Sequence, residues 1–256
     1  MKLLRSKLIL LSLAAAVACG LRAADSGFKS IFNGKDLTGW EGLPGFWSVR
    51  DGAITGQTTA EKKLTSNTFL VWKAGEVKNF ELRAQFRLQP NNDANFANSG
   101  IQYRSKVLDP AGFVVGGYQA DMDTGKYVGM LYEEKGRGIL MQPGQKIVIP
   151  RAGEAPPSGG KGEGQKKAKQ KAKVEVVSTV TTPEQLAASY KVGEWSEIRI
   201  VANGNHLQHI INGKVTADVT DNDPEKGAAS GVLALQLHQG PPMTVQFKNV
   251  QLKTLP

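Results

Sequence analysis

The sequence predicts an all-β protein folded as a two-sheet antiparallel β-sandwich. Apolar and polar residues alternate with a period of two over residues 80–89, which is typical of a strand with one buried face. Asn203-Gly204 lies at the end of one strand-like run, and Asn212-Gly213 lies directly after the next one. Both pairs favour tight hairpin turns. Many short strands at regular spacing, punctuated by Gly and Asn turns, favour an antiparallel sandwich over a parallel α/β sheet.

The predicted strands are short and separated by turns. In chain order they cover residues 47–50, 69–72, 80–89, 100–105, 118–123, 128–133, 146–149, 198–203, 206–211, 233–238 and 243–253. A short helix is predicted at residues 183–190, because Thr182 can cap it and proline suits the first helical position.

Residues 1–24 are predicted to be an export signal. A basic head, Lys2 to Lys7, precedes an apolar run over residues 8–18 that is too short to span a bilayer. The run ends at Cys19 in a sequence that resembles a degenerate lipobox, so the alternative is a lipoprotein signal ending before that residue. We therefore expect a periplasmic or secreted protein with one domain over residues 25–256, in contact with a membrane only if Cys19 is lipidated.

The formal net charge of +9 is concentrated in two segments. Residues 1–24 carry four basic and no acidic residues, and residues 151–173 carry seven basic and two acidic ones, so the remaining charge is near zero. A folded body without a basic face argues against nucleic acid as a partner. Residues 153–173 contain no large apolar side chain, which predicts a flexible, lysine-rich insertion within residues 151–173.

Acid, amide and aromatic groups are concentrated on three predicted strands between residues 99 and 134. Strand alternation predicts that these groups lie on shared faces, and we take as candidate site residues Gln102 with Arg104, Gln119 with Asp121 and Asp123, and Tyr132 with Glu134. Three more candidates come from elsewhere: Gln236 and His238 on a late strand, and Arg137 in a Gly-Arg-Gly loop that would deliver it into a pocket. Such groups bind sugar hydroxyls in multidentate fashion, whereas the alternative is an ordinary solvated sheet face.

Several other chemistries find no support in the sequence. Cys19 is the only cysteine, which excludes an intrachain disulfide and a cysteine metal site. His206 and His209 are predicted on opposite faces of one strand, and no spacing of metal ligands is typical of zinc. Nucleotide-binding and serine-hydrolase motifs do not occur. We expect no cofactor and no catalytic metal, with a structural calcium left open.

The order of these motifs resembles the 3-keto-disaccharide hydrolase family over nearly all of residues 28–252. The matching motifs are Phe32–Trp40, Phe46–Gly52, Ser99–Arg104, Gly117–Asp123, Gly129–Glu134, Glu194–Ile200 with Asn212-Gly213, and the closing Gly231–Leu252. Each motif alone is weak, but their order and spacing together are specific. The lysine-rich insertion departs from the family pattern.

The resemblance implies a concanavalin-like jelly roll and the cleavage of glycosides already oxidised to a ketone at C3. A separate sugar dehydrogenase would supply that substrate. The ketone acidifies the C2 proton, so a base forms an enolate that expels the C1 aglycone before water adds. From residue type, Asp121 or Glu134 would be the base, Arg104 or Arg137 the enolate stabiliser, and His238 an acid or base. Gln102, Gln119, Asp123, Tyr132, Arg137 and Gln236 would bind substrate.

Three alternatives remain at this level. Ordinary hydrolysis by two carboxylates cannot be distinguished without their separation. A non-catalytic, lectin-like carbohydrate-binding module would use the same fold and the same polar face. A cell-surface structural protein would use the lysine-rich insertion as its contact.

Overall fold

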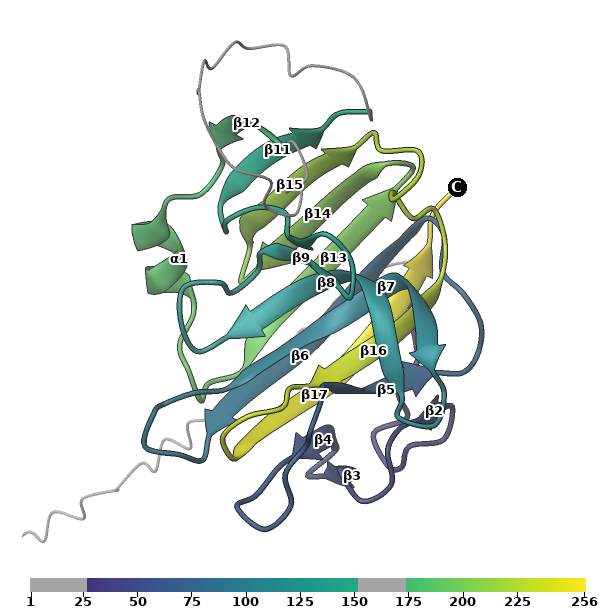
Figure 1. The fold of residues 1–256 in the computed structure, drawn as a ribbon, viewed down its shortest axis with the longest axis vertical. Coiled ribbons are helices and arrows are strands. Elements are labelled where there is room, and N and C mark those ends of the chain that lie inside the picture. The colour runs from purple at the N-terminus through teal and green to yellow at the C-terminus, as the bar shows by residue number, and fades with distance from the viewer. Residues whose placement is uncertain (1–26, 152–173) are drawn as a thin grey trace, which may run out of the picture.

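Two β-sheets stack face to face in the computed structural model, which describes residues 27–151 and 174–256 (Figure 1). The larger sheet has the strand order β12-β11-β15-β14-β13-β6-β17-β4-β3, with β1 paired to β17, and the smaller has the order β10-β9-β8-β7-β16-β5-β2. Every pairing is antiparallel except that of β11 with β15. This arrangement confirms the predicted all-β sandwich. The predicted export signal and, apart from Arg151, the lysine-rich insertion lie outside the described residues.

The strand bounds are as follows. The larger sheet contains β1 (Lys29–Ser30), β3 (Trp47–Arg50), β4 (Ala53–Gln57), β6 (Phe80–Pro90), β11 (Gln145–Ile149), β12 (Glu175–Thr179), β13 (Ser196–Asn203), β14 (His206–Ile211), β15 (Lys214–Asp221) and β17 (Met243–Thr254). The smaller sheet contains β2 (Trp40–Glu41), β5 (Thr68–Trp72), β7 (Asn98–Asp109), β8 (Val114–Asp123), β9 (Leu131–Glu134), β10 (Gly138–Ile139) and β16 (Val232–Leu237).

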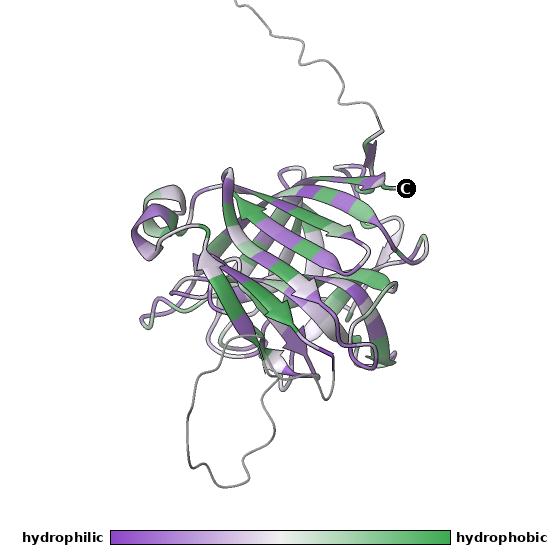
Figure 2. Ribbon diagram, turned by 90° about the horizontal axis from the view of Figure 1, so that it is seen from above, coloured by the Kyte–Doolittle hydropathy of each residue, from purple (hydrophilic) through white to green (hydrophobic). Residues whose placement is uncertain are grey.

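The core lies between the two sheets. On β6 the apolar residues of the predicted alternation, from Phe80 to Leu88, are all buried, while the polar residues between them are partly exposed. The smaller sheet contributes the alternate residues of its central strands, among them Ile101, Tyr118 and Leu235. The striping of hydrophilic and hydrophobic residues along the strands is visible in Figure 2. Because side chains alternate between faces, the polar residues beside these core positions point away from the core.

The predicted hairpins and helix are confirmed. Asn212 and Gly213 connect β14 to β15 and both have positive φ, as a tight hairpin turn of this kind requires. The helix α1 (Pro183–Ser189) begins with a reciprocal pair of hydrogen bonds between Thr182 and Gln185, so its first N–H groups are satisfied. In the described part of the chain, no helix is long and apolar enough to cross a membrane.

One predicted strand begins later than expected. The alternation at residues 128–133 predicted a strand, but β9 begins at Leu131. Gly129 has a φ of 81° and Met130 N–H donates to the Tyr127 carbonyl, so residues 127–130 form a turn. This turn is also tied to the preceding strand, because Asp121 N–H donates to the Met130 carbonyl. The shift leaves Tyr132 and Glu134 on one face, as predicted.

Candidate functional site

A small polar cavity of about 200 Å³ lies on the face of the smaller sheet that points away from the core. Its lining includes most of the carboxylate, amide and imidazole groups singled out in the sequence. The complete lining is Asn67, Asn98, Gln119, Asp121, Tyr127, Met130, Tyr132, Glu134, Ile139, Gln236 and His238.

Strand register brings the predicted residues together. Gln119 on β8 pairs with Tyr132 on β9 and with Gln102 on β7, so these three side chains form a row across the sheet. β16, which carries Gln236, follows β7 in the strand order. Residues far apart in sequence therefore share one polar face because their strands are neighbours and their alternation is in phase.

The two carboxylates of the cavity are joined through amide groups. Gln119 Nε2 donates to Asp121 Oδ1 at 2.7 Å and lies 3.5 Å from Gln236 Oε1. Gln236 Nε2 in turn donates to Glu134 Oε2 at 3.2 Å. This connected network fixes the positions of both acids, which is the preorganisation that catalytic and binding sites share.

Asp121 is the most perturbed acid of the cavity. Its side chain is only 3% exposed, and burial raises its pKa to about 7. The charges of Asp123 and Glu134 also raise this pKa, while hydrogen bonding from Gln119 and Asn98 opposes the shift. Among the described residues, Asp121 Oδ2 has no hydrogen-bond partner within normal geometry. A buried carboxyl group with one unpartnered oxygen, titrating near neutral pH, fits a general base.

Glu134 lies in a similar but less extreme environment. Burial raises its pKa, and hydrogen bonds from Asn67 and Gln236 together with the charge of Lys135 act in the opposite direction. Asn67 Nδ2 is 3.4 Å from Glu134 Oε2, and Lys135 Nζ is 4.0 Å from Oε1. The two acids thus differ in their environments, which is how paired carboxyls acquire different roles.

His238 lies at the end of β16 and is oriented by its neighbours. Its Nδ1 contacts the Gln239 carbonyl oxygen, and its ring meets the Phe96 ring edge-on at 5.7 Å. Because a carbonyl can only accept, Nδ1 carries the proton. Burial lowers the pKa of His238, so the neutral ring presents an unprotonated Nε2.

Arg104 does not share the face of Gln102, and this prediction was wrong. The register of β7 against β8 shifts after Tyr103, and Arg104 has a φ of 47°, so strand alternation breaks at this bulge. The guanidinium is buried and donates to backbone carbonyls, including that of Lys78 at 2.6 Å and that of Gly204 at 2.7 Å. Arg104 borders a different cavity, of about 290 Å³.

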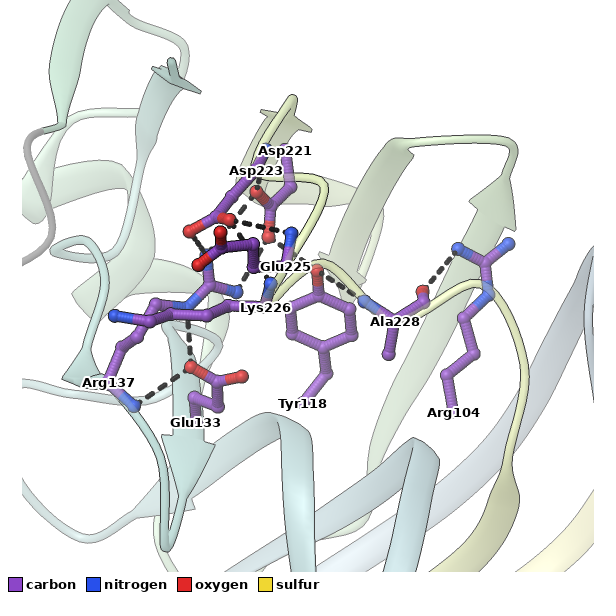
Figure 3. A network of polar contacts seen from close by, with 9 residues as sticks. All are labelled: Arg104, Tyr118, Glu133, Arg137, Asp221, Asp223, Glu225, Lys226 and Ala228. Carbon is purple, nitrogen blue, oxygen red and sulfur yellow. Dashed lines mark hydrogen bonds and ion pairs between the residues drawn. The ribbon is translucent and has the colours of Figure 1, made fainter. Parts of the chain in front are cut away.

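Arg137 also lies outside the polar cavity. It is held between Glu133 and Asp221, with Nη2 2.7 Å from Asp221 Oδ2, and Asp223 is 3.7 Å from its Nη1 (Figure 3). Tyr118 hydroxyl donates to the same Asp221 carboxylate. The loop that carries Arg137 therefore directs it into a buried ion network instead of the predicted pocket.

Two other candidates lie beside the cavity without lining it. Gln102 is fully buried, and its amide contacts that of Gln119 at 2.8 Å. Asp123 Oδ1 accepts from Tyr127 N–H at 2.9 Å and so shapes the turn after β8. Gln102 supports the position of Gln119 from the neighbouring strand, whereas Asp123 holds Tyr127, which lines the cavity.

Five lining residues escaped the sequence-based prediction: Asn67, Asn98, Tyr127, Met130 and Ile139. Asn98 could have been predicted from the sequence, because this residue continues the alternation of Gly100 and Gln102 on β7. Asn67 could not be predicted, since it lies in an irregular segment before β5 and reaches the site only through tertiary contacts with Glu134 and with Gln239 N–H at 3.0 Å. No group of three or more His, Cys, Asp or Glu residues suited to a metal occurs in residues 27–151 and 174–256.

Gly100 leaves the space that Gln119 occupies, which gives a test of the network. A Cβ at this position would lie 2.5 Å from Gln119 Cγ and Cδ. We expect Gly100→Ala to displace Gln119, to destabilise the fold by about 1–3 kcal/mol through overpacking, and to impair the site. Thermal unfolding measures the first effect, and a change in the pKa of Asp121, whose Oδ1 accepts from Gln119, measures the second. In the double variant Gly100→Ala/Gln119→Ala the space is free again; if it is no more stable than the single variant, the steric account is wrong.

Comparisons with solved structures show a shared fold. Two provisionally named glycosyl hydrolases from Parabacteroides distasonis ATCC 8503 superpose with TM-scores of 0.54 and 0.52, at 17% and 18% identity. The alignments cover 89% and 90% of this chain and 99% and 94% of those chains. Carbohydrate-binding module CBM66 from Bacillus subtilis superposes with a TM-score of 0.51 at 14% identity, over 86% of this chain and 98% of that one.

At these identities the similarity establishes a jelly-roll-like sandwich and no activity. Among curated proteins, none matches the chain. A family profile described as the 3-keto-alpha-glucoside-1,2-lyase-like domain matches residues 27–253, nearly the whole length. The chain therefore belongs to this carbohydrate-active family, the 3-keto-disaccharide hydrolases.

Proposed function

We propose that the protein cleaves 3-keto-glycosides by elimination at C1 and C2, followed by addition of water, with Asp121 as the base. The observation that carries this proposal is the buried Asp121 carboxyl, whose pKa is raised to about 7 and whose Oδ2 has no hydrogen-bond partner among the described residues. A carboxylate in that state is both available and basic enough to remove a proton acidified by an adjacent ketone.

The proposed reaction proceeds in two stages. Asp121 takes the proton from C2, the C–H electron pair forms the C2=C3 enolate, and its collapse expels the C1 oxygen to leave a C1=C2 double bond beside the restored ketone. The departing oxygen gains a proton and leaves as the free aglycone. Water then adds its oxygen to C1 and a proton to C2, which yields the free 3-keto sugar.

Other cavity residues have chemistry suited to the remaining demands. Burial raises the pKa of Tyr132, as do the charges of Glu134 and Asp121, so its hydroxyl stays protonated and can donate to the enolate oxygen. Tyr132 replaces Arg104 and Arg137 in this role, since both arginines lie elsewhere. Glu134, whose pKa is also raised, is suited to protonate the departing oxygen. The unprotonated Nε2 of His238 is suited to accept a proton from water.

The reaction is tested with matched substrates. The purified domain is incubated with a 3-keto-glucoside and with its unoxidised parent, and aglycone release is followed. We expect release from the keto form alone, and in D2O we expect deuterium to enter C2 of the product. Cleavage of the unoxidised parent at a similar rate would point to two-carboxylate hydrolysis instead.

The pH dependence follows from the state of the base. Since the pKa of Asp121 is raised to about 7, the carboxylate form is lost as pH falls through that value. We expect kcat/KM to fall about tenfold for each pH unit below 7. A profile of kcat/KM from pH 5 to pH 9 on the 3-keto-glucoside measures this. A kcat/KM that stays constant from pH 7 down to pH 5 would exclude Asp121 as the base.

A non-catalytic, lectin-like role is the second candidate. One observation favours it: no arginine or lysine lines the cavity among the described residues, so an enolate would be stabilised by neutral donors only. Amide and carboxyl groups held in a hydrogen-bonded network also suit the hydroxyls of an intact sugar. Sugar binding without release of aglycone from either substrate would establish this role and exclude catalysis.

The proposed location of the protein and the source of its substrate complete this proposal. We propose that the protein is exported, by the signal over residues 1–24, and acts on small glycosides that a separate sugar dehydrogenase has oxidised. Omitting the oxidation step is expected to leave the glycoside intact.

A further inference from the structure

The β9–β10 hairpin contributes an apolar portion to a cavity that is otherwise largely polar. Tyr132 and Ile139 are direct partners across the hairpin, and both line the cavity. Ile139 is 50% exposed, one of few large hydrophobic residues so exposed in the described part of the chain. Single exposed apolar residues are common on protein surfaces, but this one borders the cavity that contains two buried carboxyl groups.

The hairpin is held in a fixed position. Its turn contains Arg137, which donates from both its backbone N–H and its Nε to Glu133 Oε2 and binds Asp221 on β15 (Figure 3). Asp221 also accepts from the Tyr118 hydroxyl. This buried network joins the hairpin to the opposite sheet, so Ile139 is presented from a rigid support although its side chain is half exposed.

The size of the cavity decides which part of a glycoside meets Ile139. Its volume is about 200 Å³, below the roughly 300–1,000 Å³ of pockets that enclose whole drug-sized ligands. The reacting C2 must lie beside Asp121, which is 3% exposed. A sugar ring placed there fills most of this volume, so the rest of the molecule extends beyond the cavity, where Ile139 is the lining residue among the exposed large hydrophobic residues of the described chain.

We propose that Ile139, with Tyr132 beside it, binds the leaving group and selects glycosides whose aglycone is apolar. This inference rests on the proposed function for the placement of the sugar ring. A large apolar aglycone such as phenyl removes the exposed surface of Ile139 from water, whereas a polar aglycone, or one as small as methyl, gains little from that contact. Ile139 thus acts as a specificity-determining residue and takes no part in proton transfer.

The test compares two substrates and two variants. The substrates are the 3-keto forms of a phenyl and a methyl glucoside, and the variants are Ile139→Thr and Val177→Thr. Val177 on β12 is 51% exposed and does not line the cavity, which makes it a matched control. We expect Ile139→Thr to lower kcat/KM for the phenyl substrate about 3- to 10-fold, chiefly through KM, and to leave the methyl substrate nearly unchanged. We expect Val177→Thr to change neither.

Two outcomes overturn the proposal: an equal loss on both substrates, or no loss on the phenyl substrate. Its failure is separable from that of the proposed function. If the wild-type protein cleaves neither substrate, the cleavage proposal fails, and calorimetric binding of the same two compounds then tests the contact. A phenyl preference in affinity that Ile139→Thr abolishes would support it, and equal affinities in the wild-type protein, or no binding, would contradict it.

Discussion

The Asp121→Asn variant is expected to lose about 10²- to 10⁴-fold in the rate of aglycone release from a 3-keto-glucoside. Asparagine keeps the size and planarity of the side chain and can still accept from Gln119 Nε2, which lies 2.7 Å from Oδ1 in the wild-type protein. It removes only the basicity of the carboxylate. The expected loss lies in kcat more than in KM, because in the proposed reaction the proton is transferred in the transition state. Single-turnover kinetics of aglycone release measure it.

The same substitution is expected to stabilise the fold at neutral and alkaline pH. The pKa of Asp121 is raised in the folded protein to about 7, so folding is favoured by the protonated form and this contribution is lost as pH rises through 7. Replacing the carboxyl by a neutral amide removes a penalty on the order of a few kcal/mol. We therefore expect a higher Tm for the variant at pH 8 and little difference at pH 4.

Asp123→Asn is the matched control. It makes the same chemical change two positions along β8, at a residue that accepts from Tyr127 N–H at 2.9 Å and does not line the cavity. Since the charge of Asp123 raises the pKa of Asp121, its removal is expected to move the acid limb of the pH profile to lower pH. Comparable losses of rate in the two variants would indicate a structural effect and contradict the assignment of the base.

The Arg137→Met variant is expected to be destabilised by about 3–5 kcal/mol. Its guanidinium is almost fully buried, 2.7 Å from Asp221 and in contact with Glu133 (Figure 3). Removing one partner of a buried ion pair leaves the opposite charge buried without compensation, which costs far more than the pair itself contributes. For a domain of this size the expected fall in Tm is about 6–20 °C, measurable by calorimetry or circular dichroism.

Two further variants separate this explanation from a general packing defect. Arg199→Met removes a guanidinium that is 41% exposed and 2.8 Å from Glu81, so a loss of about 1 kcal/mol or less is expected. Adding Asp221→Asn to Arg137→Met removes one of the carboxylates left without its partner, while Glu133 keeps its charge, and is expected to restore part of the stability. A double variant less stable than Arg137→Met alone would show that packing, and not the buried charge, dominates.

The sequence predicted the site residues correctly on the strands whose side chains alternate regularly. Gln119, Asp121, Tyr132 and Glu134 face one cavity because side chains alternate along β8 and β9. It failed at Arg104, since a bulge on β7 reverses the alternation at that residue. A bulge of this kind depends on contacts with neighbouring strands, which local sequence does not specify.

Sequence-based prediction also failed where a side chain pairs with a residue that is distant in sequence. Arg137 lies in a loop, where no periodicity constrains its direction, and Asp221 is 84 residues away in sequence. Asn67 likewise contacts Glu134 from an irregular segment that has no periodic pattern. These partners can be identified only once the sheets are stacked.

By itself, therefore, the sequence determined the sandwich, its hairpins, its core face and the family, because period-two alternation and turn chemistry are local properties that survive folding. Tertiary structure alone decided which polar residues meet. It buried Asp121 beside Glu134 and so raised its pKa to about 7. It also placed both candidate arginines outside the cavity, because their hydrogen-bond and ion-pair partners come from distant parts of the chain. Desolvation and long-range pairing of this kind depend on the tertiary structure.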